Sequence, residues 1–166
     1  MKNIFVDMDG VLTDFKKKYC ETFAVTSTQM ADKREHKLYD MRWDQFVDDQ
    51  HFANLEWFKG GEDLVDFLRD VNPKHYNICI MTSAGGMHRQ REVQEQKLTW
   101  LSDNYIDWPA VVVPGRRFKA GFADKQSIII DDTHDVCESF VKAGGSAIEH
   151  VRVDRTLELL KLWMSL

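Results

Sequence analysis

The chain has 166 residues, of which 43% are hydrophobic and 30% are charged, and its formal net charge is −5. These values are ordinary for a soluble globular protein, and the length fits one domain with a sizeable core and a small insertion. The negative charge argues against a stable nucleic-acid complex, although a nucleotide needs only a local basic site. No apolar run approaches the ~20 residues of a membrane span, and we expect no signal peptide. Three widely spaced cysteines favour a reducing, cytoplasmic environment.

The first apolar run leads directly into an acidic motif. Residues 4–6 predict a short buried strand, and Asp7, Met8, Asp9 and Gly10 follow it. The glycine breaks the run and predicts a turn. Both carboxylates thus lie where a parallel strand would end, which is the usual place for a ligand site in an open α/β sheet. Clustered carboxylates repel one another, so we expect a hard cation such as Mg²⁺ between them.

Apolar runs like the first recur along the chain, at residues 78–81, 110–113, 128–130 and 147–151. Helical stripes of apolar residues lie between and after these runs: Leu64, Val65, Leu68 and Val71; Val93, Leu98 and Leu101; Val136, Phe140 and Val141; and residues 157–162. Strands that alternate with helices form a parallel sheet covered on both faces. The predicted fold is therefore α/β, a Rossmann-like three-layer sandwich around a parallel sheet of about five strands.

One segment, residues 15–59, interrupts this alternation. It contains no strand candidate and is far longer than the ~12–15 residues of an ordinary loop. It is rich in aromatic residues: Phe15, Tyr19, Phe23, Tyr39, Trp43, Phe46, Phe52, Trp57 and Phe58. We interpret it as a small helical cap inserted after the first strand, with residues 1–14 and 60–166 forming the core domain.

Polar residues follow four of the predicted strands: Asp7 and Asp9; Thr82 and Ser83; the basic loop 115–119 with Lys119; and Asp131 and Asp132. The carboxyl ends of parallel strands share one edge of the sheet, so these residues can converge. Metal-assisted phosphoryl transfer needs this combination of groups. An aspartate can attack phosphorus and form an aspartyl-phosphate, while a neighbouring acid protonates the leaving oxygen and then activates water. A metal ion, a lysine and hydroxyl donors neutralise the charge on the transferring group.

The four motifs resemble those of the haloacid dehalogenase (HAD) superfamily of phosphohydrolases across the full chain. Residues 7–13 are similar to its first motif, Thr82 to its second and Asp131-Asp132 to its fourth. The third motif is a lysine, for which Lys119 and Lys125 compete. Lys119 is favoured because it lies farther before Asp131, with a helical turn between them, as members of the superfamily usually arrange it.

The resemblance implies a role for each of these side chains. Asp7 would be the nucleophile and Asp9 the general acid and base. Mg²⁺ would be the cofactor, held by Asp7, by Asp131 and by the backbone carbonyl of Asp9. Thr82 and Lys119 would bind the phosphoryl oxygens, with Ser83 beside them. Asp132 either supports the site or caps the helix that follows it.

Within the superfamily, the chain is most similar to the 5′(3′)-deoxyribonucleotidases. Those enzymes share the Asp-Met-Asp-Gly-Val-Leu sequence, a Thr-Ser second motif and an aromatic cap, whereas Ala84 stands where they often have a proline. The implied substrate is a (deoxy)nucleoside monophosphate. Of the cap aromatics, Phe52 and Trp57 are the favoured candidates to face the cleft and stack on the base.

Three other functions remain open at this point. A phosphatase of a non-nucleotide metabolite would use the same core residues. A phosphatase of nucleic-acid ends would also use them, but it should carry a basic channel, and the net charge of −5 argues against one. A non-catalytic binding module would keep the fold and lose a motif, whereas all four motifs are present here.

Overall fold

The computed structural model describes residues 1–30 and 36–166. Its centre is a five-stranded parallel sheet with the strand order β3-β2-β1-β4-β5. The strands are β1 (Lys2–Val6), β2 (Tyr76–Ser83), β3 (Ala110–Val113), β4 (Ser127–Asp131) and β5 (Ser146–Glu149). Each strand overlaps one of the apolar runs in the sequence, although the last run was predicted to reach Val151, which lies beyond β5 and is exposed. The predicted parallel α/β sheet is therefore confirmed.

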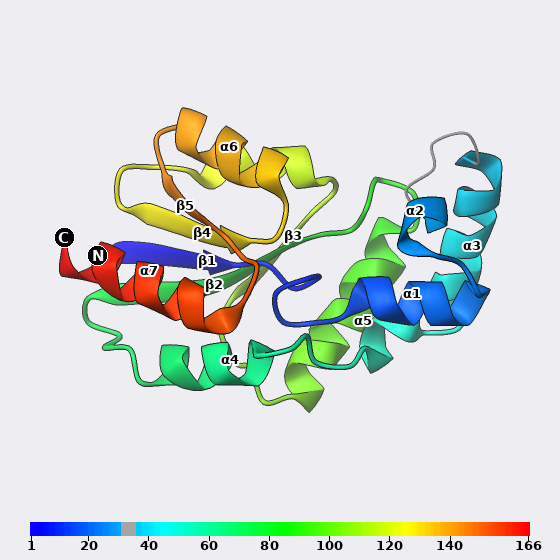
Figure 1. Cartoon of the computed structure of the whole chain (residues 1–166), viewed down its shortest axis with the longest axis horizontal. Helices are drawn as coiled ribbons and strands as arrows, with labels where there is room; N and C mark the ends of the chain where they lie inside the picture. The colour runs from blue at the N-terminus through cyan, green and yellow to red at the C-terminus, as the bar shows by residue number, and fades with distance from the viewer. Residues whose placement is uncertain (31–35) are drawn as a thin grey trace.

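Helices cover both faces of this sheet (Figure 1). One face carries α4 (Gly61–Arg69), α5 (Gln90–Asp103) and α7 (Val153–Ser165), and the other carries α6 (His134–Lys142) and the 3₁₀ helix η3 (Arg116–Phe122). The connections from β1 to β2 and from β2 to β3 thus run over one face. Those from β3 to β4 and from β4 to β5 run over the other. In such a sheet the ligand site lies at the carboxyl ends of the strands, at the point where the connections switch from one face of the sheet to the other. No helix in the described ranges is long and apolar enough to cross a membrane.

The chain between β1 and α4 contains four helical segments in the described residues. It forms α1 (Phe15–Phe23), α2 (Ser27–Met30), α3 (His36–Asp48) and the 3₁₀ helix η2 (His51–Asn54). These helices lie beyond the carboxyl ends of the strands (Figure 1). Their aromatic side chains form a shared cluster in which the rings of Phe15 and Phe46 are 5.4 Å apart. Residues 31–35 of the predicted cap lie outside the described part of the chain.

A tight turn at Gly10 returns the chain toward the sheet after β1. The backbone N–H groups of Val11, Leu12 and Thr13 all donate to the carbonyl oxygen of Met8. Gly10 has a φ of +82°, in the left-handed region that favours glycine. This turn keeps Asp9 near the end of β1 and supports the predicted break at the glycine.

Candidate active site

Three carboxylates meet at the carboxyl ends of β1 and β4. Asp7 follows β1, Asp131 ends β4, and Asp132 follows it; one oxygen from each lies within 4.8 Å of the other two. Asp7 and Asp131 are buried, whereas Asp132 reaches the surface. Burial and the nearby charge of Asp131 raise the pKa of Asp7. Partial burial, together with the charges of Asp7 and Asp131, raises the pKa of Asp132 to about 6.

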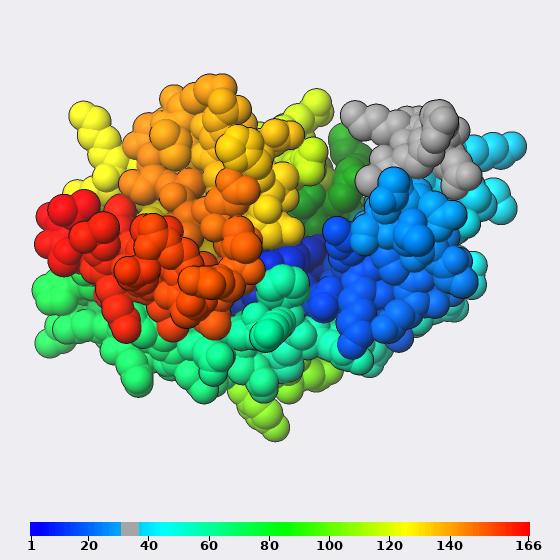
Figure 2. All heavy atoms as spheres, viewed as in Figure 1, coloured from blue at the N-terminus to red at the C-terminus, as the bar shows by residue number. Residues whose placement is uncertain are grey.

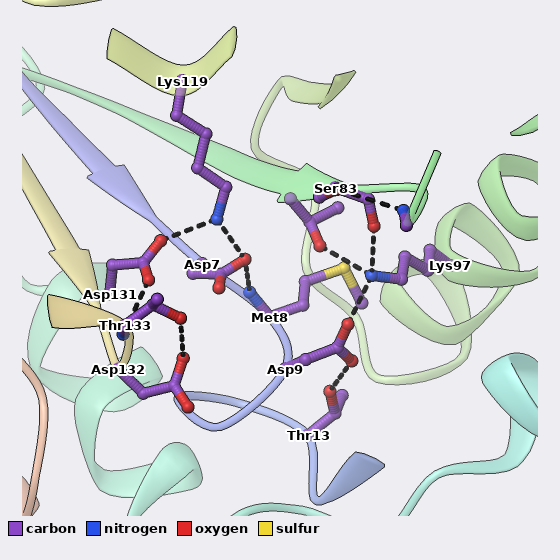
Figure 3. Close-up of polar contacts among 12 residues, drawn as sticks. Asp7, Met8, Asp9, Thr13, Ser83, Lys97, Lys119, Asp131, Asp132 and Thr133 are labelled. Carbon is purple, nitrogen blue, oxygen red and sulfur yellow. Dashed lines mark hydrogen bonds and ion pairs between the residues drawn. The ribbon is translucent and has the colours of Figure 1, made fainter. Parts of the chain in front are cut away.

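Lys119 places a cation between two of these carboxylates (Figure 3). Its Nζ lies 2.8 Å from Oδ1 of Asp7 and 2.7 Å from Oδ2 of Asp131, and the residue is 1% exposed. Burial opposes the charge of this lysine, but the two carboxylates outweigh burial and raise the pKa of Lys119. Lys125, the competing candidate, is exposed. The geometry therefore favours Lys119 as the lysine of the site.

A second buried lysine, Lys97 of α5, contacts Asp9. Its Nζ lies 2.6 Å from Oδ2 of Asp9, 2.8 Å from Oγ1 of Thr82 and 2.8 Å from the carbonyl oxygen of Ser83. The other oxygen of Asp9, Oδ1, accepts a hydrogen bond from the Thr13 hydroxyl. The Asp9 carboxylate is thus paired with Lys97 and lies outside the three-carboxylate cluster. Asp132, which the sequence analysis placed only as a supporting or capping residue, supplies the third carboxylate of the cluster.

The sequence analysis predicted the burial of Val93 and Leu101 in α5 correctly, but it took Leu98 as their buried neighbour and so missed Lys97. The predicted stripe included Leu98, which is 40% exposed. The buried residues of the helix are Val93, Gln96, Lys97, Trp100 and Leu101. Position 97 lies four residues after Val93 and three before Trp100, so it falls on the same face of the helix as these residues. A lysine on this apolar face is the sequence signal that could have identified Lys97 as a buried, functional residue.

Thr82 and Ser83 end β2, and the structure brings only one of their hydroxyls into contact with the charged residues. Thr82 is 1% exposed and accepts the hydrogen bond from Lys97. The Ser83 hydroxyl accepts a hydrogen bond from the backbone N–H of Gly85, so it shapes the loop after β2. Asp132 does not cap α6, because the N-cap residue is Thr133, whose hydroxyl donates to Oδ1 of Asp132 at 3.3 Å.

Of the two cap aromatics favoured from the sequence, Phe52 is buried and Trp57 is half-buried. Phe52 is 1% exposed, and its ring stacks on Phe15 with a centroid distance of 5.5 Å. Trp57 packs against Trp100, with 4.8 Å between the ring centroids. Phe52 instead covers Lys97, whose Nζ lies 5.3 Å from the centre of its ring. The expectation that Phe52 stacks on a base is therefore not met in this structure.

Two other cap aromatics, both in α3, keep part of their surface exposed. Tyr39 and Trp43 are half-buried and stack with 6.2 Å between their ring centroids. Burial, with smaller contributions that include the charge of Asp9, raises the pKa of Tyr39 to about 12. Trp43 packs against Gly85, just after β2. A hollow separates the blue cap residues from the yellow and orange core residues (Figure 2).

The comparisons with known proteins support the fold. No family model and no curated protein matches this sequence. A Thermotoga maritima protein assigned as a β-phosphoglucomutase aligns with a TM-score of 0.57 and 16% identity over 98% of this chain and 99% of that one. A Streptococcus pneumoniae hydrolase aligns with a TM-score of 0.54 and 15% identity over 97% of this chain and 100% of that one.

A third solved structure is a HAD family enzyme from Bacteroides thetaiotaomicron. It aligns with a TM-score of 0.51 and 15% identity over 89% of this chain and 93% of that one. That protein is an aspartate-to-alanine mutant in complex with magnesium and inorganic phosphate. At such low identities these likenesses establish a shared fold, and the chemistry of this chain has to be argued from its own residues.

Proposed function

We propose that this chain is a Mg²⁺-dependent phosphomonoesterase of the HAD superfamily. The observation that carries the proposal is the position of Lys119 between Asp7 and Asp131, at the carboxyl ends of adjacent strands. A buried carboxylate beside a fixed ammonium is suited to attack a phosphoryl group and to offset its charge. The fold shared with solved hydrolases adds support.

The residues of the site fit the proposed metal ion. Oxygens of Asp7, Asp131 and Asp132 converge, and this cluster contains no His or Cys side chain. Hard oxygen ligands are what Mg²⁺ prefers. Burial and mutual repulsion raise the pKa values of Asp7 and Asp132, and the charge of the ion would offset both effects. When bound, the ion would supply a positive charge next to the transferring phosphoryl group.

The side chains would then carry out hydrolysis in two steps. An Asp7 oxygen attacks phosphorus while Asp9 gives its proton to the leaving oxygen, which produces an aspartyl-phosphate and an alcohol. Asp9 next takes a proton from water, and the water oxygen attacks phosphorus and releases phosphate and Asp7. Thr82 and Lys119 bind the phosphoryl oxygens during both steps.

For the substrate we propose a small phosphate ester, and specifically a (deoxy)nucleoside monophosphate. The stacked pair Tyr39 and Trp43 keeps exposed surface, and Trp43 packs against Gly85 in the loop that follows Thr82. An aromatic face suits a nucleobase. The sequence resemblance to the 5′(3′)-deoxyribonucleotidases supports the same class. A non-nucleotide phosphate ester is the alternative, since the core residues are indifferent to the leaving group.

A panel of phosphate esters would test both the phosphatase activity and the preference for nucleotides. We would measure phosphate release from nucleoside monophosphates, sugar phosphates and p-nitrophenyl phosphate, each with Mg²⁺ and with excess chelator. We expect Mg²⁺-dependent hydrolysis, fastest for the nucleotides. Faster hydrolysis of sugar phosphates would reject the nucleotidase and keep the phosphatase. Trp43→Ala should lower kcat/KM about tenfold for nucleotides and leave p-nitrophenyl phosphate less affected, because stacking is worth ~1–3 kcal/mol per base.

A further inference from the structure

Lys97 has no free donor for a bound phosphoryl group. An ammonium offers three N–H donors and no acceptor. In Lys97 these three donors have partners at 2.6 to 2.8 Å: a carboxylate oxygen of Asp9, the hydroxyl of Thr82 and the carbonyl of Ser83. The role of Lys97 therefore differs from that of Lys119, which lies between the nucleophile and Asp131.

These contacts determine how Asp9 can present a proton. Oδ2 of Asp9 accepts from Lys97, and Oδ1 lies 2.9 Å from the hydroxyl of Thr13. The ammonium has no acceptor, whereas the Thr13 hydroxyl can accept as well as donate, so Oδ1 is the oxygen that can carry a proton in this arrangement. The Asp9 side chain is 27% exposed, whereas Lys97 is 1% exposed. A buried lysine thus orients a carboxyl group that remains open to a substrate.

The same ammonium orients the hydroxyl of Thr82. A hydroxyl carries one proton and has two lone pairs. Since Oγ1 of Thr82 accepts from Lys97, its own proton is directed away from the lysine. Thr82 is then prepared to donate to a phosphoryl oxygen.

The cap excludes water from this contact. The ring of Phe52 covers Nζ of Lys97, and the side chain of Gln96 fixes η2 and α3 by accepting from the backbone N–H of Phe52 and donating to the carbonyl of Val47. Ion pairs and hydrogen bonds are stronger where water is excluded. Lys97 therefore contacts both the cap, through Phe52, and the ends of two strands, through Thr82 and Asp9. Figure 3 shows its contacts with Asp9 and Ser83.

We propose that Lys97 is a positioning residue that orients Asp9 toward the leaving oxygen and the Thr82 hydroxyl toward the phosphoryl group. The inference rests on the proposed phosphatase function. In the step concerned, an Asp7 oxygen bonds to phosphorus, the bond from phosphorus to the leaving oxygen breaks, and the proton on Oδ1 of Asp9 moves to that oxygen.

Leaving-group dependence provides the test. The kcat/KM value reports events up to departure of the leaving group, and p-nitrophenolate departs without a proton whereas an alkoxide does not. We would compare the effect of Lys97→Met on p-nitrophenyl phosphate and on an alkyl phosphate in Mg²⁺. A misplaced general acid should lower kcat/KM for the alkyl ester by about 100-fold or more. The loss for the nitrophenyl ester should be clearly smaller.

Control variants distinguish a selective loss for the alkyl ester from a general loss of activity. Thr82→Val removes the other side-chain hydroxyl or carboxylate that accepts a hydrogen bond from Lys97, and it should slow both esters by the same factor. Lys125→Met removes an exposed lysine and should slow neither. In an Asp9→Asn background, Lys97→Met should no longer distinguish the two esters. Lys97→Gln, which retains a polar group, provides a second variant if thermal unfolding shows that Lys97→Met is misfolded.

Each outcome has a separate meaning. An active wild type with equal losses for both esters in Lys97→Met and Lys97→Gln would overturn the role of Lys97 and leave the phosphatase proposal intact. A difference between the esters that persists in the Asp9→Asn background would also overturn it. A wild type that hydrolyses no phosphate ester would reject the proposed function and, with it, this inference.

Discussion

The backbone at Gly10 lies against the carboxylate of Asp132, so close that a Cβ on residue 10 would be 2.2 Å from Oδ2 of Asp132. Gly10, in the turn after β1, therefore packs directly against Asp132, the residue after β4. Glycine satisfies two conditions there, since its φ of +82° is also one that other residues rarely adopt. The turn that presents Asp9 and the position of Asp132 depend on each other.

Gly10→Ala should destabilise the protein and disturb the proposed metal site. The left-handed backbone alone costs about 1–3 kcal/mol for a residue with a side chain, and Asp132 must move to make room for the methyl group. Thermal unfolding and a Mg²⁺ titration followed by calorimetry would measure both effects. Gly121→Ala is the control, because its Cβ would meet nothing within 4 Å. A Gly10→Ala variant as stable as the wild type would contradict this account of the turn.

Asp7→Asn should abolish turnover while the protein stays folded. The amide is nearly the same size as the carboxylate but is a far weaker nucleophile. Its loss should cost several powers of ten in kcat, and residual turnover above about one per cent would remove Asp7 from the nucleophilic role. Phosphate release and thermal unfolding should be measured on the same preparation, so that a loss of activity is not confused with a loss of structure.

Lys119→Ala should damage both stability and activity, and Lys125→Ala should affect neither strongly. Removing Lys119 leaves the buried Asp7 and Asp131 without the cation that lies between them. Breaking a buried pair in this way costs about 3–5 kcal/mol. Lys125 is exposed. Denaturant unfolding and kcat/KM for each variant would check the prediction, and greater damage from Lys125→Ala would place the lysine of the third motif at position 125.

Excess chelator should remove activity, and Mg²⁺ should restore it and raise the unfolding temperature. The three convergent carboxylates repel one another, and a ligand that binds only the folded state stabilises it by about 2.7 kcal/mol at a hundred times its Kd. Asp132→Asn should weaken the Mg²⁺-induced shift. Full activity in excess chelator, or an unfolding temperature unchanged by Mg²⁺, would argue against the metal assignment.

His150 should make stability fall as the pH drops. The residue is 4% exposed, its Nδ1 lies 2.8 Å from the Thr156 hydroxyl oxygen, and burial lowers the pKa of its imidazole from 6.5. The unfolded state then binds a proton that the folded state does not, so the free energy of unfolding decreases below about pH 6.5 and continues to decrease down to the folded pKa. The slope is at most about 1.4 kcal/mol per pH unit. In His150→Asn, the free energy of unfolding should depend less on pH between pH 7 and 5 than it does in the wild type. Denaturant unfolding across this range would measure the difference. The same pH dependence in both proteins would show that His150 does not contribute to it.

Local sequence patterns determined the sheet and the location of the site. The run at residues 128–130, for example, is apolar because β4 is buried on both faces, and Asp131 follows where the strand reaches the site. Such features are local, since a strand buried on two faces must be apolar throughout. Because all parallel strands end at one edge, the convergence of Asp7 and Asp131 could also be predicted.

Only the tertiary structure decided which charged and aromatic side chains meet. Lys97 pairs with Asp9 although 88 positions separate them, and Phe52 covers that lysine instead of facing the hollow. Asp132, and not the Asp9 carboxylate, completes the cluster with Asp7 and Asp131. These outcomes depend on how the cap and α5 pack against the strand ends. A sequence pattern specifies which face of a helix or strand is buried, whereas long-range packing specifies what that face is buried against.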